Sequence, residues 1–214
     1  MTYRTDEDEA VIETRVVHDT HRRATTLLSD VTATGGAPAD AVGSLHGLVV
    51  PMLRHHHESE DGDLWPTIVE AAPSLAGRLD ALSREHDTLD EALSRMAATL
   101  TPVTAGEVRG LVHEHLDHEE PILFPALRAH VTTADWDAFS ERTVATAPQE
   151  GIELMVALFF EVAPAADVEV LLRHLPPEAQ AGIPAMRAAG DRILAALAPH
   201  ESVGAGRAGR HGTG

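Results

Sequence analysis

One pattern of histidine and carboxylate occurs twice in this chain, and it constrains the fold more than any other feature. In the first copy His56 and Glu60 stand four residues apart, and His115 and Glu119 repeat this spacing in the second copy. An aromatic residue and a proline follow each copy at equal offsets. A spacing of four puts both side chains on one face of a helix. Two such helices facing each other would gather most of a dinuclear metal site.

Apolar residues recur with helical spacing in four long stretches. The expected helices cover about residues 8–31, a stretch from residue 38 or 40 to Pro66, residues 75–100, and a stretch from Thr104 into the region of Pro121 and Pro125. The third is the clearest, because its apolar positions alternate spacings of four and three and His86 stands where leucine is expected. Four amphipathic helices with short connections predict an all-α fold, an antiparallel up-down four-helix bundle.

After about residue 133 the sequence becomes rich in alanine, leucine and proline and has no histidines at ligand spacing. Shorter helices are expected here, divided by prolines; they cover about residues 135–140, 150–162, 168–175 and 178–197. The predicted organisation is a bundle over residues 8–130, a small C-terminal helical extension over 133–200, and a flexible tail over 201–214.

Composition narrows the possible partners and cofactors. The formal net charge of −18 argues against nucleic acid or an anionic membrane surface as a partner. The absence of cysteine excludes disulfides, iron–sulfur clusters and thiolate zinc sites. No stretch is apolar enough for a membrane span, and the N-terminus has no apolar signal region, so a cytoplasmic protein is expected, as a monomer or a homodimer.

Two carboxylates and three histidines fall on the apolar stripes that should face the bundle interior. They are Glu60, Glu119, His56, His86 and His115. An unpartnered buried carboxylate costs roughly several kcal/mol, and too few lysines or arginines share these stripes to neutralise two of them. Metal cations would do so, and imidazole with carboxylate suits iron or manganese, with zinc as an alternative.

The ligand expected from the first helix has two candidates. Periodicity favours His21, because it belongs to the stripe that includes Ala24 and Leu28. Repetition favours His18, because a His-Asp-Thr triplet begins there and again at His86. The residues alone leave both open, and both are expected to border the site.

Several short motifs together resemble the hemerythrin-like family, also called HHE cation-binding proteins, over about residues 10–130. They are Val17-His18-Asp19 with Arg22-Arg23, His55-His56-His57 with Glu60-Asp61 and Leu64-Trp65-Pro66, Glu85-His86, and His115-Leu116-Asp117 with Glu119-Glu120. The segment from Thr133 to Trp136 also resembles the extension found in bacterial members. The order of ligands over four helices is the specific part of the resemblance, since a lone His-x-x-x-Glu is a weak signal.

The resemblance implies a hemerythrin-like bundle that holds two non-haem iron ions joined by an oxo or hydroxo bridge, with manganese or zinc ranked below iron. The implied ligands are the bridging glutamates Glu60 and Glu119 and the terminal histidines His18, His56, His86 and His115. His18 is preferred to His21 because the family's histidine is followed four residues later by arginine, here Arg22.

Such a protein is expected to interact with O₂ or another small diatomic or peroxide ligand, and so to bind, sense or store O₂ or iron. The alternative is an enzyme that turns over peroxide or nitric oxide at the same centre, so enzymatic activity is left open. A third interpretation is a helical interaction module without metal.

One position departs from the oxygen-carrying members of the family. They have a second histidine four residues before the one that matches His86, and Leu82 stands there in this chain. One iron is therefore expected to lack a histidine, which favours redox reaction over reversible O₂ storage. Asp90, one turn after His86, is a possible substitute ligand, but a solvated aspartate is the preferred interpretation.

The remaining polar and aromatic residues near the motifs carry weaker expectations. His57 and His118 are either donors that orient the carboxylates or solvated residues, whereas Asp61 and Glu120 are expected to flank the site. Trp65 and Phe124 are expected to pack in the core at the end of the bundle. Surface positions are expected for His46, His130, His174, His200 and His211.

Overall fold

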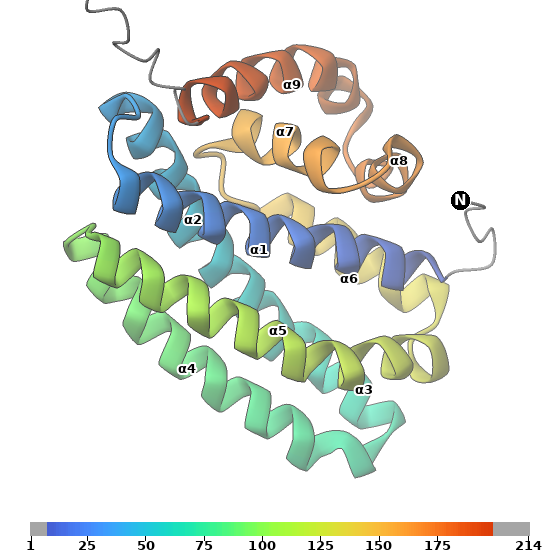
Figure 1. Ribbon diagram of the computed structural model, residues 1–214. Helices are drawn as coiled ribbons and strands as arrows, with labels where there is room; N and C mark the ends of the chain where they lie inside the picture. The colour runs from blue at the N-terminus through green and yellow to red at the C-terminus, as the bar shows by residue number, and fades with distance from the viewer. Residues whose placement is uncertain (1–7, 199–214) are drawn as a thin grey trace, which may run out of the picture.

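The computed structural model describes residues 8–198, and these residues are helical almost throughout, with no strand among them (Figure 1). The predicted all-α fold is confirmed. The bundle is formed by α1 (Glu9–Thr34), α2 (Ala39–Ser59), α3 (Trp65–Ala71), α4 (Ala76–Ala98) and α5 (Pro102–His130). In Figure 1, α1 and α5 run side by side, with α4 beyond α5.

The second helix does not end at its proline but passes through a π-helical turn into α3. This turn spans Glu60–Leu64, and the Trp65 N–H donates to the carbonyl of Glu60, five residues earlier. Pro66 follows in the first turn of α3, where its missing N–H and its ring would otherwise disturb the regular i−4 ladder. Because π-turns concentrate at functional sites, the position of Glu60 at the start of this one is informative.

The third and fourth predicted helices match α4 and α5. The heptad positions of α4 are buried, and His86 is among them. The Thr101 side chain accepts from the N–H of Thr104 and the Thr104 side chain accepts from the N–H of Thr101, which caps the start of α5. Pro121 and Pro125 lie inside α5, which continues to His130.

The C-terminal helices are α6 (Thr133–Thr146), α7 (Ile152–Val162), α8 (Ala165–Leu172) and α9 (Pro177–Leu197). In Figure 1, α7, α8 and α9 lie on the side of α1 that faces away from α4 and α5, and α7 and α8 contact α1. Trp136 of α6 instead belongs to an apolar cluster with Leu82 of α4 and Leu123 of α5. Leu154 and Leu158 of α7 and Leu197 of α9 are at most 2 % exposed and belong to the same apolar cluster as Leu28 and Leu45 of the bundle. The extension and the bundle thus share one core.

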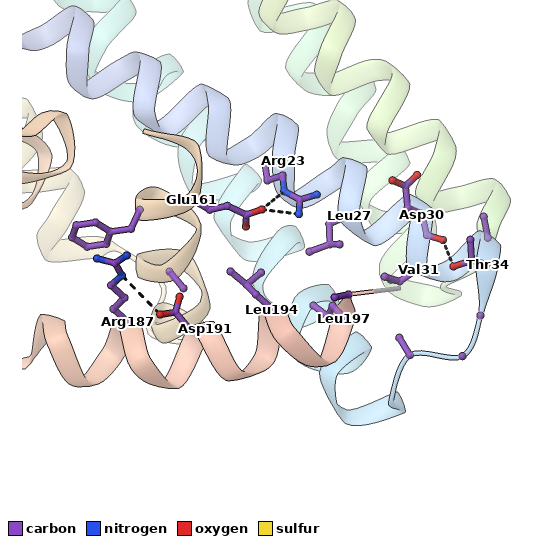
Figure 2. A pocket seen from close by; sticks show the side chains of 17 residues that line it. Arg23, Leu27, Asp30, Val31, Thr34, Glu161, Arg187, Asp191, Leu194 and Leu197 are labelled. Atoms are coloured by element: carbon purple, nitrogen blue, oxygen red, sulfur yellow. Dashed lines mark hydrogen bonds and ion pairs between the residues drawn. The ribbon is translucent and has the colours of Figure 1, made fainter. Parts of the chain in front are cut away.

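A groove of about 910 Å³ lies between α1 and α9 (Figure 2). Leucine and valine side chains of α1 and α9 form much of its apolar lining. Four of its charged groups form two pairs: Arg23 Nη2 lies 2.7 Å from Glu161 Oε1, and Arg187 Nε lies 3.9 Å from Asp191 Oδ2.

The expectations for the C-terminal end fall outside this structure, and the expectation about membrane spans falls within it. The predicted tail over residues 201–214, together with His200 and His211, lies outside the described residues. Within residues 8–198, none of the helices combines the length and the apolar character that a membrane crossing requires.

Candidate metal centre

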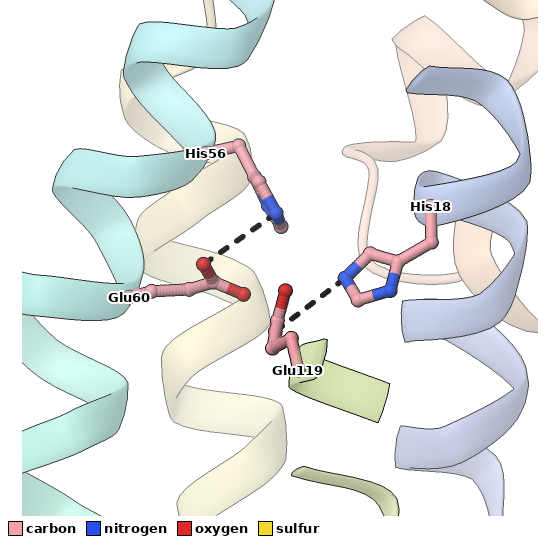
Figure 3. Close-up of side chains that lie close together, drawn as sticks. All are labelled: His18, His56, Glu60 and Glu119. Atoms are coloured by element: carbon pink, nitrogen blue, oxygen red, sulfur yellow. Dashed lines mark ion pairs between the residues drawn. The ribbon is translucent and has the colours of Figure 1, made fainter. Parts of the chain in front are cut away.

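All six predicted ligand side chains converge inside the bundle, and they come from α1, α2, the π-turn, α4 and α5. Figure 3 shows four of them pointing toward one another. The donor atoms form two groups in which every pair lies within 4.8 Å. The first group is His18, His56, Glu60 and Glu119, and the second is Glu60, His86 and His115.

The first group joins α1, α2 and α5. His18 Nε2 lies 3.7 Å from Glu119 Oε1, and His56 Nε2 lies 3.5 Å from Glu60 Oε2 (Figure 3). None of these four atoms has a hydrogen-bond partner, although all are buried. Unsatisfied buried polar atoms are rare and need an explanation, and a cation among them supplies one.

The second group lies beside the first and shares Glu60 with it. His86 Nε2 lies 3.5 Å from Glu60 Oε2 and 3.1 Å from His115 Nε2, which is in turn 3.3 Å from Glu119 Oε2. Two nitrogens bound at about 2.1 Å to one ion, at a right angle, would stand about 3 Å apart. The two imidazoles are therefore spaced as neighbouring ligands of one ion.

The outer nitrogen of three of these histidines faces a carboxylate. His18 Nδ1 lies 3.2 Å from Glu120, His86 Nδ1 lies 2.9 Å from Asp61, and His115 Nδ1 lies 2.9 Å from Glu85. The expectation that Asp61 and Glu120 flank the site is confirmed. A carboxylate on the outer nitrogen fixes the ring orientation and leaves Nε2 free toward the interior, the usual arrangement of metal-bound histidine.

Further contacts hold the flanking carboxylates in place. Arg22, one turn after His18, donates to Glu120 through Nη1 at 2.5 Å and to Asp117 through Nη2 at 3.1 Å. Ser83 donates to Asp61 at 2.6 Å. The exposed side chain of His118 contacts Glu85, 3.2 Å from its Nδ1. Of the two expectations for His118, a role in orienting a carboxylate and a solvated position, the structure combines both.

The electrostatics of the site fit a cation. Burial raises the pKa of Glu60 well above its ordinary value, and the nearby charge of Glu119 raises it further. Burial also opposes ionisation of Glu119, but the attraction of His18 and His115 outweighs it and lowers the pKa of Glu119 to about 2. Burial, His57 and His115 lower the pKa of His86 to about 4. Burial opposes protonation of His115, but Glu119 and Glu85 outweigh it and raise the pKa of His115. A bound cation would replace the protons of these groups, and the freed imidazole nitrogens with the two close carboxylates form a donor set for positive ions.

Both histidines proposed for the first helix are buried, but only His18 joins a group of donor atoms. His21 belongs to neither group, and its ring centroid lies 4.5 Å from that of His56. Its Nδ1 is buried without a hydrogen-bond partner. Burial, followed by the neighbouring His18, lowers the pKa of His21 well below its ordinary value.

His57 is a buried residue of the centre rather than a solvated one. Its ring stacks on that of His86 at 4.4 Å with an interplanar angle of 9°, and its Nδ1 lies 3.0 Å from Asp90. Asp90 therefore contacts His57, and it belongs to neither group of donor atoms. Leu82 is 2 % exposed and packs with Leu79 in an apolar cluster, so its helix position contributes no ligand.

Two aromatic side chains lie on either side of the centre. Trp65 is 4 % exposed and stacks toward His86 at 6.3 Å, whereas Phe124 stacks toward His18 at 6.1 Å. Trp65 belongs to an apolar cluster against which Phe124 packs, so the expected core packing is confirmed.

Two histidines predicted at the surface are not surface residues. The His174 side chain is 5 % exposed, with its Nε2 3.1 Å from Glu13 Oε1. His46 is half-buried, and its Nε2 is enclosed without a partner. His174 lies in the turn after α8 and reaches Glu13 of α1, a contact that no local pattern in the sequence signals. His130 is exposed, as predicted.

Glu13 is a buried carboxylate that the sequence did not single out. Its Oε2 accepts from Trp136 Nε1 at 3.1 Å and from Ser140 Oγ at 3.3 Å, and its Oε1 lies 3.3 Å from Arg173 Nη2. Burial raises its pKa, and His174 opposes this shift. These partners all follow the bundle in sequence, so Glu13 connects α1 to the extension. No spacing within α1 signals this role.

Comparison with known proteins gives one match. The model of the family described as hemerythrin HHE cation binding domain matches residues 13–127, which include every residue of the two donor groups. No curated protein and no solved structure matches the chain. The matched residues make up more than half of the sequence and include both His-x-x-x-Glu motifs, so this chain belongs to the hemerythrin HHE cation-binding domain family.

Proposed function

We propose that this protein holds two non-haem iron ions in its bundle and interacts there with O₂ or a related small oxidant, to bind, sense or store O₂ or iron. The domain is of a cation-binding family, and its histidine and glutamate clusters fit a metal site. The observation that carries the proposal is the set of buried, unpartnered donor atoms on His18, His56, Glu60 and Glu119.

The proposed roles follow from which residues the two groups share. Glu60 belongs to both groups, and Glu119 contacts His18 of the first and His115 of the second. We assign both glutamates as bridging ligands and the four histidines as terminal ligands, through Nε2. Imidazole and carboxylate without thiolate favour iron, with manganese and zinc as the competing metals. Bound iron would supply Lewis acidity and redox chemistry.

The experiment is iron analysis with optical spectra of the purified full chain, prepared in air and without oxygen. About two irons per chain, with ferric bands that disappear on reduction, would support the proposal. His115→Ala and Glu119→Ala should each deplete iron, because each removes a donor and leaves the opposite ligands unpaired. His130→Ala is the control, since its side chain is exposed and belongs to neither group. Unchanged occupancy in both site variants would refute the ligand set.

A second candidate function is turnover of peroxide or nitric oxide at the same centre. Leu82 is buried among apolar side chains and Asp90 contacts His57, so neither belongs to a donor group. A position open to a small ligand on one ion favours reaction over storage. Steady-state decay of peroxide separates the two functions: sustained turnover supports the enzyme, and a stable oxygen complex over hours supports the carrier.

A further inference from the structure

A cavity of about 440 Å³ lies between the bundle and the extension, apart from the groove of Figure 2. Its lining comes from α1 and α2 on one side and from α6, α7, α8 and α9 on the other. Exposed residues Ala145, Gln149 and Pro176 are part of the lining, so the cavity reaches the surface where α6 ends and α9 begins. Its volume falls within the range of about 300–1,000 Å³ typical of small-molecule sites.

Most of the polar side chains in the wall of this cavity are already hydrogen-bonded within the protein, so the wall is effectively apolar. The hydroxyls of Thr14, Thr20 and Ser59 each donate to a backbone carbonyl one turn earlier in their own helix. The carboxylate of Glu13 is saturated by its contacts with α6 and the end of α8. No lysine or arginine is among the described residues that line the cavity. An anionic ligand would find no counter-charge here. A cationic ligand would meet only Glu13, whose own contacts satisfy it, and Glu60, which belongs to the donor groups, so the wall selects an uncharged ligand.

One end of the cavity is polar and borders the candidate metal centre. His21, His56 and Glu60 all line it. His21 is 2 % exposed, and its Nδ1 is buried without a hydrogen-bond partner. A hydroxyl group both donates and accepts, so it satisfies this nitrogen in either tautomer of the ring. By contrast, none of the buried side-chain atoms that lack a hydrogen-bond partner among the described residues belongs to the lining of the α1–α9 groove.

We propose that this cavity binds an uncharged, mainly apolar organic molecule that carries a hydroxyl group, with the hydroxyl hydrogen-bonded to His21 Nδ1 and the apolar body between α1, α2 and the extension. The bound molecule then lies beside His56 and Glu60, which belong to the cavity wall and to the first donor group alike. His21 is assigned to this ligand, and not to metal. The inference goes beyond the proposed function, because binding in the cavity needs no metal.

The experiment uses the full chain, as purified and after chelator treatment. N-phenyl-1-naphthylamine, an uncharged fluorophore that brightens in apolar surroundings, serves as the probe, and 2-naphthol and naphthalene compete with it. The protein should bind the probe saturably, and 2-naphthol should compete about fivefold better than naphthalene, as one net hydrogen bond predicts. His21→Leu should abolish this preference while retaining naphthalene binding and the iron content of the purified protein.

A second variant blocks the cavity without touching the polar end. Val144 of α6 lines the cavity and is half-buried, so Val144→Trp should weaken probe binding at least about tenfold through lost volume. Val103→Trp is the matched control, because Val103 is 78 % exposed and lies outside the cavity. Equal probe binding by both tryptophan variants would overturn the proposal. So would an unchanged hydroxyl preference in His21→Leu, whereas iron loss in His115→Ala tests the metal assignment separately.

Discussion

His57 illustrates how much one side chain can depend on its neighbours. It stacks on His86 at 4.4 Å and is fixed through Nδ1 by Asp90 at 3.0 Å, although it belongs to neither donor group. Removing its ring would free His86 to turn away from His115. We expect His57→Ala to lower the affinity for the second ion by about 10–100-fold, the usual effect of losing a residue that orients a ligand.

The measurement for this variant is the ratio of iron to protein after dialysis against a graded series of chelator concentrations. The variant should lose one iron at a lower chelator concentration than the unmodified protein and keep the other. His130→Ala, on an exposed histidine of α5, should follow the unmodified protein. Parallel loss of both irons in His57→Ala would show that the stack with His86 has no separate role.

Glu13 supports a prediction about stability. Alanine at this position would leave Trp136 Nε1, Ser140 Oγ and His174 without their buried acceptor. We expect Glu13→Ala to lower the free energy of unfolding by about 3 kcal/mol, as for other broken buried networks. Glu9→Ala should cost only about 0.5 kcal/mol, because Glu9 pairs with the same Arg173 from an exposed position. Urea denaturation measures both, and equal losses would contradict this account.

The sequence could predict the site residues that are joined by local spacing, but not those that meet only through tertiary packing. His56 with Glu60 and His115 with Glu119 are visible because one helical turn joins each pair. Glu13 meets Trp136 and His174 only through tertiary packing, and no local rule connects positions so far apart in the chain. The periodicity of α1 alone could not separate His18 from His21, since both are buried on one helix, and the preference for His18 came from the family resemblance.

At the scale of elements, α7 and α9 cross so closely that only glycine fits at the crossing. A Cβ atom on Gly190 would lie 2.1 Å from the Glu153 carbonyl oxygen and 2.6 Å from Ala157 Cβ. Because the contact is with backbone, which cannot move aside, Gly190→Ala should cost about 2–3 kcal/mol through overpacking. This loss outweighs the gain of about 1 kcal/mol that alanine brings to a helix interior.

Gly182→Ala in the same helix is the matched control for this crossing. The nearest heavy atom to its new Cβ would be Met186 Cε at 3.4 Å, at the end of a flexible side chain. This variant should be neutral or slightly stabilised in thermal denaturation. If both alanine variants raised the melting temperature, α7 and α9 would have to be further apart than described.

The sequence predicted where the helices begin better than where prolines would end or bend them. The four apolar repeats predicted where α1, α2, α4 and α5 begin to within a few residues, because burial of one face governs where a helix runs. Proline was the less reliable signal. Pro121 and Pro125 lie within α5, and the chain passes Pro66 by a π-turn. The buried side chains beside these prolines, such as Leu64 and Leu123, hold the helices in place and offset the lost backbone hydrogen bonds.

The bundle and the extension share one apolar core, so cutting the chain at the predicted boundary between them should lower the stability of the bundle. Leu154, Leu158 and Leu197 contribute side chains from the extension to the cluster that contains bundle residues. Each buried leucine contributes roughly 1.5–3 kcal/mol relative to exposure. A fragment of residues 8–131 should therefore be less stable than the full chain by several kcal/mol and should expose apolar surface from α1 and α2.

The fragment also separates metal binding, which we assign to the bundle, from binding in the cavity, which needs the extension. All six proposed metal ligands lie within residues 8–131, whereas much of the cavity wall lies in α6, α7, α8 and α9. If the fragment is held folded by saturating metal, it should keep its iron but lose saturable binding of N-phenyl-1-naphthylamine. Iron analysis and probe titration on the same sample measure the two together. A fragment as stable as the full chain would establish residues 8–131 as an independent folding unit, and the shared leucine core would then contribute little to the bundle.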